Sequence, residues 1–289
     1  MSKLRQVRIE NSGAEMITSV KNAKIKLARG LSSNRKIRRT EKAFFIEGVH
    51  AITAARKNAW DIRYLYYCPE SPLSEWAQDI ITKVEGDRLV PINSYVQAQL
   101  SDRDASSELM AVIEQSPAKM EDISLVDDLL VLILDRPHSP GNLGSAIRSA
   151  DALGAHAVLI TGHAADIYDP KAVRATMGSL FSLPVIYVPE HSELETWLSQ
   201  ARMALGALQV VATSAHADQT LYEHDLTWAT VMVIGNETSG ISRYYVDVCD
   251  VYLSIPMRGS ASSVNASVAA SIFLYEASRQ RNLKKQSGK

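Results

Sequence analysis

Apolar and polar positions follow two different patterns along this chain of 289 residues. Over roughly the first 115 residues, short runs of β-branched and aromatic residues alternate with segments whose apolar positions recur at helical spacing. Strands that alternate with helices indicate a small α/β domain. The expected strands are 43–48, 62–68, 88–92 and 109–114, and the expected helices are 18–31, 49–57, 75–84 and 95–100.

Beyond residue 128 the expected strands become almost continuously apolar. Such runs indicate strands that are buried on both faces, as in a parallel sheet covered by helices. The expected fold of this half is a doubly wound α/β domain. Its expected strands are 129–134, 157–160, 184–188, 209–212, 231–234 and 251–255, and its expected helices are 144–153, 170–177, 192–205, 241–246 and 264–281.

These patterns divide the chain into four segments. Residues 1–16 have mixed charge and no clear period, which predicts a flexible leader. Residues 17–115 form the first α/β domain. Residues 116–128 contain Pro117 and several acidic side chains without a strong period, so we expect a linker. Residues 129–289 form the second α/β domain.

Composition places the chain among globular proteins, with 46% hydrophobic and 22% charged residues. No apolar run approaches the roughly 18–20 residues that span a bilayer, and residues 1–10 carry no apolar core of a secretory signal. We expect Cys68 and Cys249, which lie in apolar contexts, to be buried reduced thiols. These observations predict a cytoplasmic protein without a membrane partner.

Charge is distributed unevenly, although the net charge of the chain is only −1. Residues 1–63 contain 15 of the 31 lysines and arginines but only 5 of the 32 aspartates and glutamates. The densest basic run is Arg35, Lys36, Arg38 and Arg39. A basic end on a neutral protein favours contact with a polyanion such as RNA over a merely solvated helix face.

Three glycine- and polar-rich segments, 142–148, 235–240 and 255–265, each follow an apolar run and precede an expected helix. Open α/β sheets bind ligands in the crevice outside the carboxyl ends of their strands, so these loops predict a binding site. The commonest α/β chemistries are excluded. The chain has no P-loop, no dinucleotide-binding glycine fingerprint, no nucleophile elbow, and no histidine or cysteine spacing typical of a metal site.

The three segments resemble the motifs of the SpoU/TrmH branch of the SPOUT superfamily, the RNA ribose 2′-O-methyltransferases. Asn142 and Arg148 match the first motif, Asn-x-Gly-x-x-x-Arg, and 235–240 match the second. Ile255-Pro256-Met257 with Ser263-Val264-Asn265 match the third, in which valine replaces the usual leucine. The resemblance extends to 18–114, marked by Phe44 to Gly48, which is similar to the family's L30e-like substrate-binding domain.

The resemblance implies an α/β fold with a deep trefoil knot in the second domain, a homodimer, and S-adenosylmethionine as cofactor. It places the catalytic cleft at Arg148, Asn142, Glu237, Ser263 and Asn265. Backbone groups of Gly235, Ile255 and Val264 would bind the cofactor, and Arg174 is a candidate contact to RNA phosphate beside the basic run. No metal is implied.

The role of Arg148 has two interpretations. The family assigns the equivalent arginine as a general base, but a guanidinium stays protonated in proteins. We therefore favour an arginine that binds the phosphate beside the target ribose and stabilises the developing alkoxide. The alternatives for the other positions are structural: Asn142 as a helix cap, Glu237 as a charge at a helix N-terminus, and Ser263 and Asn265 as caps of the last helix.

The predicted function is S-adenosylmethionine-dependent 2′-O-ribose methylation of structured RNA. Ribosomal RNA of the 23S type is favoured over transfer RNA, because an L30e-like module suits folded ribosomal elements. The alternatives are a tRNA methyltransferase of the same family, and an RNA-binding or ribosome-assembly factor that has lost the chemistry. The complete set of catalytic residues argues against the inactive factor. The sequence does not identify the nucleotide or its base.

Overall fold

The computed structural model describes residues 15–101 and 106–287 of the chain. Most of the predicted leader, residues 1–14, lies outside the described residues. The chain divides into two compact units. The first comprises the residues up to Ser116 together with Tyr168–Pro170, and the second comprises Pro117–Ile167 and Lys171–Lys289. Within the described residues, no helix is both long and apolar enough to cross a membrane.

The first unit contains a four-stranded sheet in the order β1-β4-β2-β3, in which β4 is antiparallel to both β1 and β2 and β3 is parallel to β2. The predicted alternation of strands and helices is confirmed. The strands are β1 (Ala43–Glu47), β2 (Ile62–Tyr67), β3 (Leu89–Pro91) and β4 (Leu109–Glu114), and the helices are α1 (Ala23–Ser33), α2 (Arg35–Glu41), α3 (Val49–Lys57), α4 (Glu75–Thr82) and α5 (Ser94–Leu100).

The basic run of the first unit is helical, which the sequence analysis did not predict. Asn34 ends α1 in an extended conformation and starts α2, because its Oδ1 accepts hydrogen bonds from the backbone N–H of Lys36 (2.8 Å) and Ile37 (3.4 Å). Asparagine is well suited to this position because its short side chain can satisfy the free amides of a helix start. Likewise, α1 begins at Ala23 rather than Thr18, since Asn22 caps it.

The second unit contains a seven-stranded parallel sheet in the order β7-β6-β5-β10-β8-β11-β9. The predicted parallel α/β fold of this half is confirmed. Its strands are β5 (Leu130–Asp135), β6 (Ala157–Thr161), β7 (Val185–Val188), β8 (Gln209–Thr213), β9 (Gln219–Thr220), β10 (Thr230–Ile234) and β11 (Val251–Ser254), and its helices are α6 (Pro140–Ala152), α7 (Pro170–Thr176), α8 (His191–Leu205), α9 (Arg243–Val248) and α10 (Ala266–Ser287).

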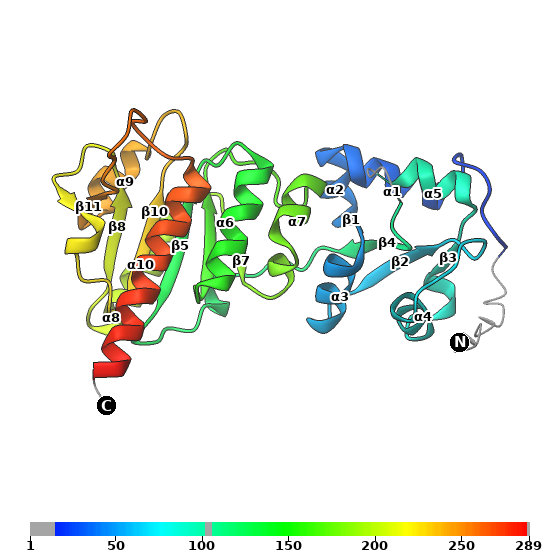
Figure 1. Ribbon diagram of the computed structural model, residues 1–289, viewed down its shortest axis with the longest axis horizontal. Coiled ribbons are helices and arrows are strands. Elements are labelled where there is room, and N and C mark those ends of the chain that lie inside the picture. The colour runs from blue at the N-terminus through cyan, green and yellow to red at the C-terminus, as the bar shows by residue number, and fades with distance from the viewer. Residues whose placement is uncertain (1–14, 102–105, 288–289) are drawn as a thin grey trace. The chain divides into compact units, whose positions relative to one another are not determined.

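Helices cover both faces of the parallel sheet, as its apolar strands require. On one face α6 and α10 pack side by side (Figure 1). On the other, side chains of α8 and α9 such as Trp197 and Tyr245 join a core with alternate residues of β5 and β10. Ile123, from the segment predicted as a linker, is 5% exposed and belongs to the same core. That segment therefore packs in part against the sheet.

The strand order reverses beside β5. The chain builds outward from β5 through β6 to β7, then returns with β8 and later inserts β10 between β8 and β5. Open parallel sheets bind ligands where such a reversal leaves a crevice at the carboxyl ends of the strands. The loops that follow β5 and β10 leave the sheet at this position.

Candidate functional site

Two of the predicted motifs meet at the carboxyl ends of β5 and β10. Asn142, in the first turns of α6, donates a hydrogen bond of 2.8 Å from Nδ2 to Oε1 of Glu237. The helix starts at this place because Ser139 caps it, with Oγ accepting from the Asn142 backbone N–H, and Pro140 occupies its first turn. Proline is tolerated there because the first amides of a helix have no partner within it. Ser139, rather than Asn142, is thus the helix cap.

The loop that carries Glu237 is closed on itself. The backbone N–H of Asn236 donates to Gly240 O (2.9 Å), and the N–H of Gly240 donates to Asn236 O (3.0 Å). Asn236 is 6% exposed, and its Oδ1 accepts from the N–H groups of Thr238 and Ser239. A Cβ on Gly235 would lie 2.5 Å from the backbone of Gly240. Glycine at 235 is therefore required for the loop to fold back.

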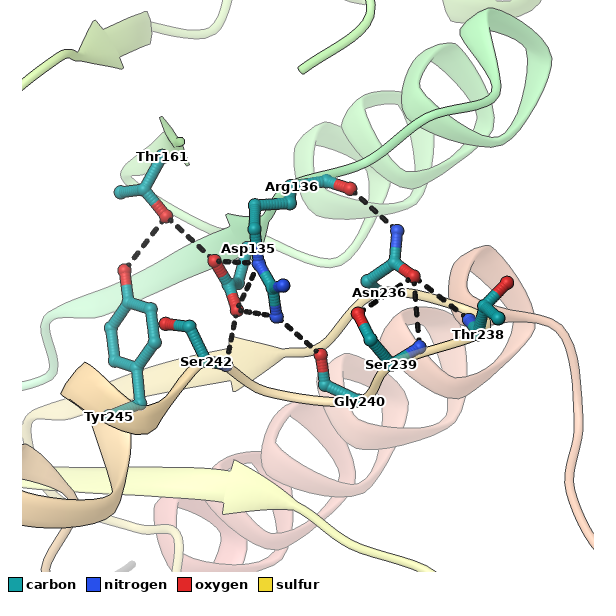
Figure 2. Close-up of polar contacts among 9 residues, drawn as sticks. All are labelled: Asp135, Arg136, Thr161, Asn236, Thr238, Ser239, Gly240, Ser242 and Tyr245. Atoms are coloured by element: carbon teal, nitrogen blue, oxygen red, sulfur yellow. Dashed lines mark hydrogen bonds and ion pairs between the residues drawn. The ribbon is translucent and has the colours of Figure 1, made fainter. Parts of the chain in front are cut away.

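The end of β5 binds this loop through a buried polar network (Figure 2). Asp135 is 2% exposed, and its Oδ2 accepts a hydrogen bond of 2.6 Å from the backbone N–H of Ser242. The guanidinium of Arg136 pairs with the same carboxylate at 3.0 Å and also donates to Gly240 O at 3.0 Å. The Arg136 carbonyl accepts from Asn236 Nδ2 at 2.8 Å. Three points of the loop are thus attached to two consecutive residues.

The network continues away from the loop through two hydroxyl groups. The Oγ1 of Thr161 lies 3.0 Å from the hydroxyl of Tyr245 and 3.5 Å from Oδ1 of Asp135. Burial raises the pKa of Tyr245 well above its ordinary value, so this phenol stays protonated and can donate a hydrogen bond. The Ser242 Oγ is buried and has no partner among the described residues.

Arg148 is exposed on α6, one helical turn after Ser145 and six residues after Asn142. It makes no hydrogen bond or ion pair with another predicted catalytic residue among the described positions. Arg148 therefore lies on the solvent-exposed surface of the unit that carries the two motif loops. Arg174 is likewise exposed, on α7.

The helix that carries Arg148 packs closely against α7. A Cβ on Gly144 would lie 2.2 Å from the carbonyl oxygen of Ala172 and 2.7 Å from the Cβ of Ala175. Only glycine at 144 allows this approach of a helix to the neighbouring backbone. The glycine of the first motif is therefore explained by packing rather than by a ligand.

The third motif follows β11 and leads into α10. Ser263 is exposed, and Ile255 and Val264 are half-buried. Asn265 caps the helix, because its Oδ1 accepts from the Ser267 N–H at 2.8 Å and from the Ser267 hydroxyl at 2.7 Å. The structure thus supports the capping alternative for Asn265. It does not join Ser263 or Asn265 to the pair formed by Asn142 and Glu237.

The backbone of the third motif is open for a ligand. Within the described residues, the N–H and C=O groups from 256 to 264 form no hydrogen bond with the rest of the chain, and all but Val264 of these residues are exposed. Nothing lies within 4 Å of the Cβ position of Gly259. A loop with unpaired donors and acceptors fits a ligand with many polar edges, such as a nucleoside. These features fit the predicted cofactor site.

The side chains of the predicted basic run do not all lie on the protein surface. Arg35, Lys36 and Arg39 are exposed, whereas Arg38 is 2% exposed and donates from NH1 to the Leu31 carbonyl at 2.7 Å. The helical spacing of α2 turns Arg38 inward while its neighbours face solvent. A direct contact of Arg38 with RNA does not fit this burial, so the candidate RNA contacts of the run reduce to the other three.

Sequence reasoning missed Asp135, Arg136 and Ser242 as parts of the site. One signal was available: the apolar strand Leu-Val-Leu-Ile-Leu ends on the carboxylate of Asp135, which is then forced to be buried. A buried carboxylate requires partners, and this one finds them on the loop of the second motif. Among the described residues, no group of three His, Cys, Asp or Glu side chains could hold a metal ion.

Comparisons with known proteins agree with the motif assignment. A model of the SpoU rRNA Methylase family matches residues 129–275, and one of the MRM3-like substrate binding domain matches residues 22–111. The 23S rRNA (uridine(2479)-2′-O)-methyltransferase of Streptomyces viridochromogenes is 41% identical over 268 residues, which are 93% of each protein. The 23S rRNA (guanosine-2′-O-)-methyltransferase RlmB of Pseudomonas putida is 31% identical over 83% of this chain and 98% of its own length.

Solved structures give the same result. The SpoU methyltransferase AviRb of S. viridochromogenes, in complex with the cofactor AdoMet, superposes with a TM-score of 0.83 and 42% identity. The match covers 90% of this chain and 98% of that one. The predicted resemblance is confirmed, and the chain belongs to the SpoU rRNA Methylase family.

Proposed function

We propose that this protein transfers a methyl group from S-adenosylmethionine to the 2′-hydroxyl of a ribose in 23S ribosomal RNA. The observation that carries the proposal is the hydrogen bond between Asn142 and Glu237. It brings two motifs 95 residues apart together at the carboxyl ends of β5 and β10, with Arg148 exposed on the same helix as Asn142. The full-length relatives named as 23S rRNA 2′-O-methyltransferases support the reaction and the class of substrate.

The cofactor would bind at the loops of the second and third motifs. Backbone groups of Gly235, Ile255 and Val264 are the proposed contacts, and the unpaired backbone from 256 to 264 supports the assignment of Val264. The AdoMet complex of AviRb supports the identity of the cofactor. When bound, S-adenosylmethionine supplies an electrophilic methyl group on a sulfonium centre. The protein then has to align the ribose 2′-oxygen with this methyl group and to stabilise negative charge on that oxygen.

Arg148 is proposed to bind the RNA phosphate beside the target ribose and to stabilise negative charge on the 2′-oxygen. A planar guanidinium can donate to both oxygens at once, and it keeps its charge at every physiological pH. Asn142 and Glu237 orient the start of α6 relative to the loop after β10. Ser263 and Asn265 stand at the entrance to α10, where Ser263 has its hydroxyl free to reach substrate.

The first unit is proposed as the RNA-binding module, with an L30e-like fold. The exposed Arg35, Lys36 and Arg39 on α2, together with the excess of basic residues before position 64, support it. Arg174 is a further proposed phosphate contact. A trefoil knot in the second unit, a homodimeric assembly and a cytoplasmic location are proposed on the family resemblance.

The test is methyl transfer to 23S rRNA. Purified full-length protein would be incubated with radiolabelled S-adenosylmethionine and with total RNA from cells that lack the gene. Label in 23S rRNA that makes one phosphodiester bond resistant to alkaline hydrolysis is the expected result. Label confined to tRNA would identify the alternative substrate class. No label in any RNA, from folded protein that binds the cofactor, would identify an inactive RNA-binding factor and overturn the proposal.

A further inference from the structure

Asp135 and Arg136 are consecutive in the chain and form an ion pair that is not a simple surface contact. The side chain of Asp135 is 1% exposed and that of Arg136 is 29% exposed. Removing a carboxylate from water is costly unless its oxygens are fully paired. Here the Arg136 guanidinium donates through both Nε and NH2, and the Ser242 backbone N–H supplies a further hydrogen bond.

The backbone is arranged to make this pair possible. Arg136 has φ of +52°, in the left-handed region that residues other than glycine rarely adopt. Gly162 leaves room for its side chain, since a Cβ at that position would lie 2.6 Å from Cγ of Arg136. A strained residue held by its surroundings points to a functional constraint at that position.

Asp135 and Arg136 together bind the loop from Gly235 to Ser242 at three places along its length. The carbonyl of Arg136 accepts from Asn236, its guanidinium donates to Gly240 O, and Asp135 accepts from the Ser242 N–H. Figure 2 shows these contacts converging from the end of β5 on the loop. Glu237 lies between the first two attachment points and reaches Asn142 at 2.8 Å.

We propose that Asp135 and Arg136 are positioning residues, which set the place of Glu237 against Asn142 and do not themselves contact the substrate. The assignment rests on the proposed methyl transfer. Alanine at 136 removes both contacts, because the same guanidinium nitrogen donates to the Asp135 carboxylate and to Gly240 O, at 3.0 Å each. Loss of the guanidinium frees the middle of the loop while the backbone contact to Asn236 remains.

A double-mutant cycle tests this role. In single-turnover methyl transfer at saturating cofactor and RNA, Arg136→Ala and Glu237→Ala should each reduce the rate by about 10- to 100-fold. The double variant should be no slower than Glu237→Ala alone, because a positioning residue has no effect once the group that it positions is absent. Arg202→Ala is the matched control. It removes another arginine–aspartate pair of the same unit, at 2.9 Å from Asp250, and should leave the rate unchanged.

Hydrogen exchange gives a second readout that does not need activity. The amide of Ser242, which Asp135 protects, should exchange faster in Arg136→Ala than in Arg202→Ala, while the amides of β5 keep their protection. Multiplied rate losses in the double variant, or unchanged Ser242 exchange, would overturn the positioning role. A wild-type protein that methylates no RNA but shows the exchange difference would overturn only the proposed function.

Discussion

Asn142 and Glu237 are joined by a hydrogen bond of 2.8 Å that links the start of α6 to the loop after β10. The amide nitrogen donates and the carboxylate accepts, so the contact is charge-assisted and sensitive to the chemistry of either partner. Glutamine at 237 keeps an acceptor oxygen in the same place. Aspartate at 142 removes the donor and sets two carboxylates against each other.

The methyl-transfer rates of variants at these two positions should therefore depend on whether the substitution keeps this hydrogen bond. We expect Glu237→Gln to lose less methyl-transfer rate than Glu237→Ala, and Asn142→Asp to lose more than Asn142→Ala. Single-turnover rates at saturating cofactor would establish the order. Equal rates for both variants at each position would mean that this hydrogen bond does not determine the rate.

Arg148 should be required for the chemical step but not for folding, because its side chain is exposed and bound to none of the other predicted catalytic residues. Arg148→Ala should reduce the single-turnover rate by about 10²–10³-fold, the usual effect of losing one electrostatic contact to the transition state. Arg148→Lys should also be slow, since an ammonium lacks the planar fork. Arg279→Ala, at an exposed arginine of α10, is the control. Near-normal turnover by Arg148→Ala would show that the motif arginine has another role.

Cofactor binding should be measurable without RNA. Calorimetry with S-adenosylmethionine or its demethylated product should give a dissociation constant between micromolar and sub-millimolar, about −5 to −8 kcal/mol. The unpaired backbone of the third motif provides the donors and acceptors. No heat at millimolar ligand, from protein with a normal thermal transition, would contradict the assignment of this site.

The basic helix α2 offers a test that separates exposed from buried arginines. Replacing Arg35, Lys36 and Arg39 with Ala should weaken RNA binding and flatten its dependence on salt, because each lost phosphate contact removes about 0.7 to 0.9 from the logarithmic slope. Arg38→Ala should instead lower the melting temperature, because the buried Arg38 guanidinium donates a hydrogen bond to the Leu31 carbonyl. An unchanged salt slope in the triple variant would mean that this face is only solvated.

Gly144 provides a packing prediction. Gly144→Ala would place a methyl group 2.2 Å from the Ala172 carbonyl oxygen, so the helices must separate at a cost of about 1–3 kcal/mol. Gly141→Ala in the same helix is the matched control, because its nearest atom lies 3.9 Å away. Denaturant unfolding should show a lower free energy of unfolding for Gly144→Ala, and an unchanged or slightly higher one for Gly141→Ala.

The cysteines should be unreactive in the native protein. Burial raises the pKa of the Cys249 thiol to about 12, so at pH 8 the thiol is almost entirely protonated and little of the thiolate that alkylating reagents attack is present. Cys68 has no exposed surface. A thiol reagent at pH 8 should titrate neither group until denaturant is added, and then two. The expected burial is confirmed for Cys68, whereas Cys249 is only half-buried. Rapid labelling of Cys249 in folded protein would contradict the raised pKa of its thiol.

The sequence predicted most elements because local pattern decided them. Strand 109–114 and helix 49–57 match β4 and α3 in full, since glycine, charge and apolar period mark their ends. Helix α2 was missed because a run of four basic residues has no apolar face to reveal it. Strand β9, of two residues, exists only through pairing with β11, which no local pattern encodes.

The site was predicted less completely. Asn142 and Glu237 were found through motifs, but Arg136 was not, because its role depends on a left-handed backbone and on a carbonyl 104 residues away. Asn265 illustrates the opposite case, in which a motif residue is used locally as a helix cap. Local signals find side chains, whereas the contacts that position them arise only from the fold.

The place of β10 in the sheet has a consequence for folding kinetics. This strand bridges β5 and β8, so before it inserts, the sheet exists only as two separate groups of strands. Its pairing with β5 joins Val231 to Val131 across 100 residues of chain, and contacts of such separation form slowly. The loop that carries Glu237 follows directly from this strand. We therefore expect the candidate site to assemble in the late, slow phase of refolding, and partly folded molecules to have native-like helices before they recover any activity.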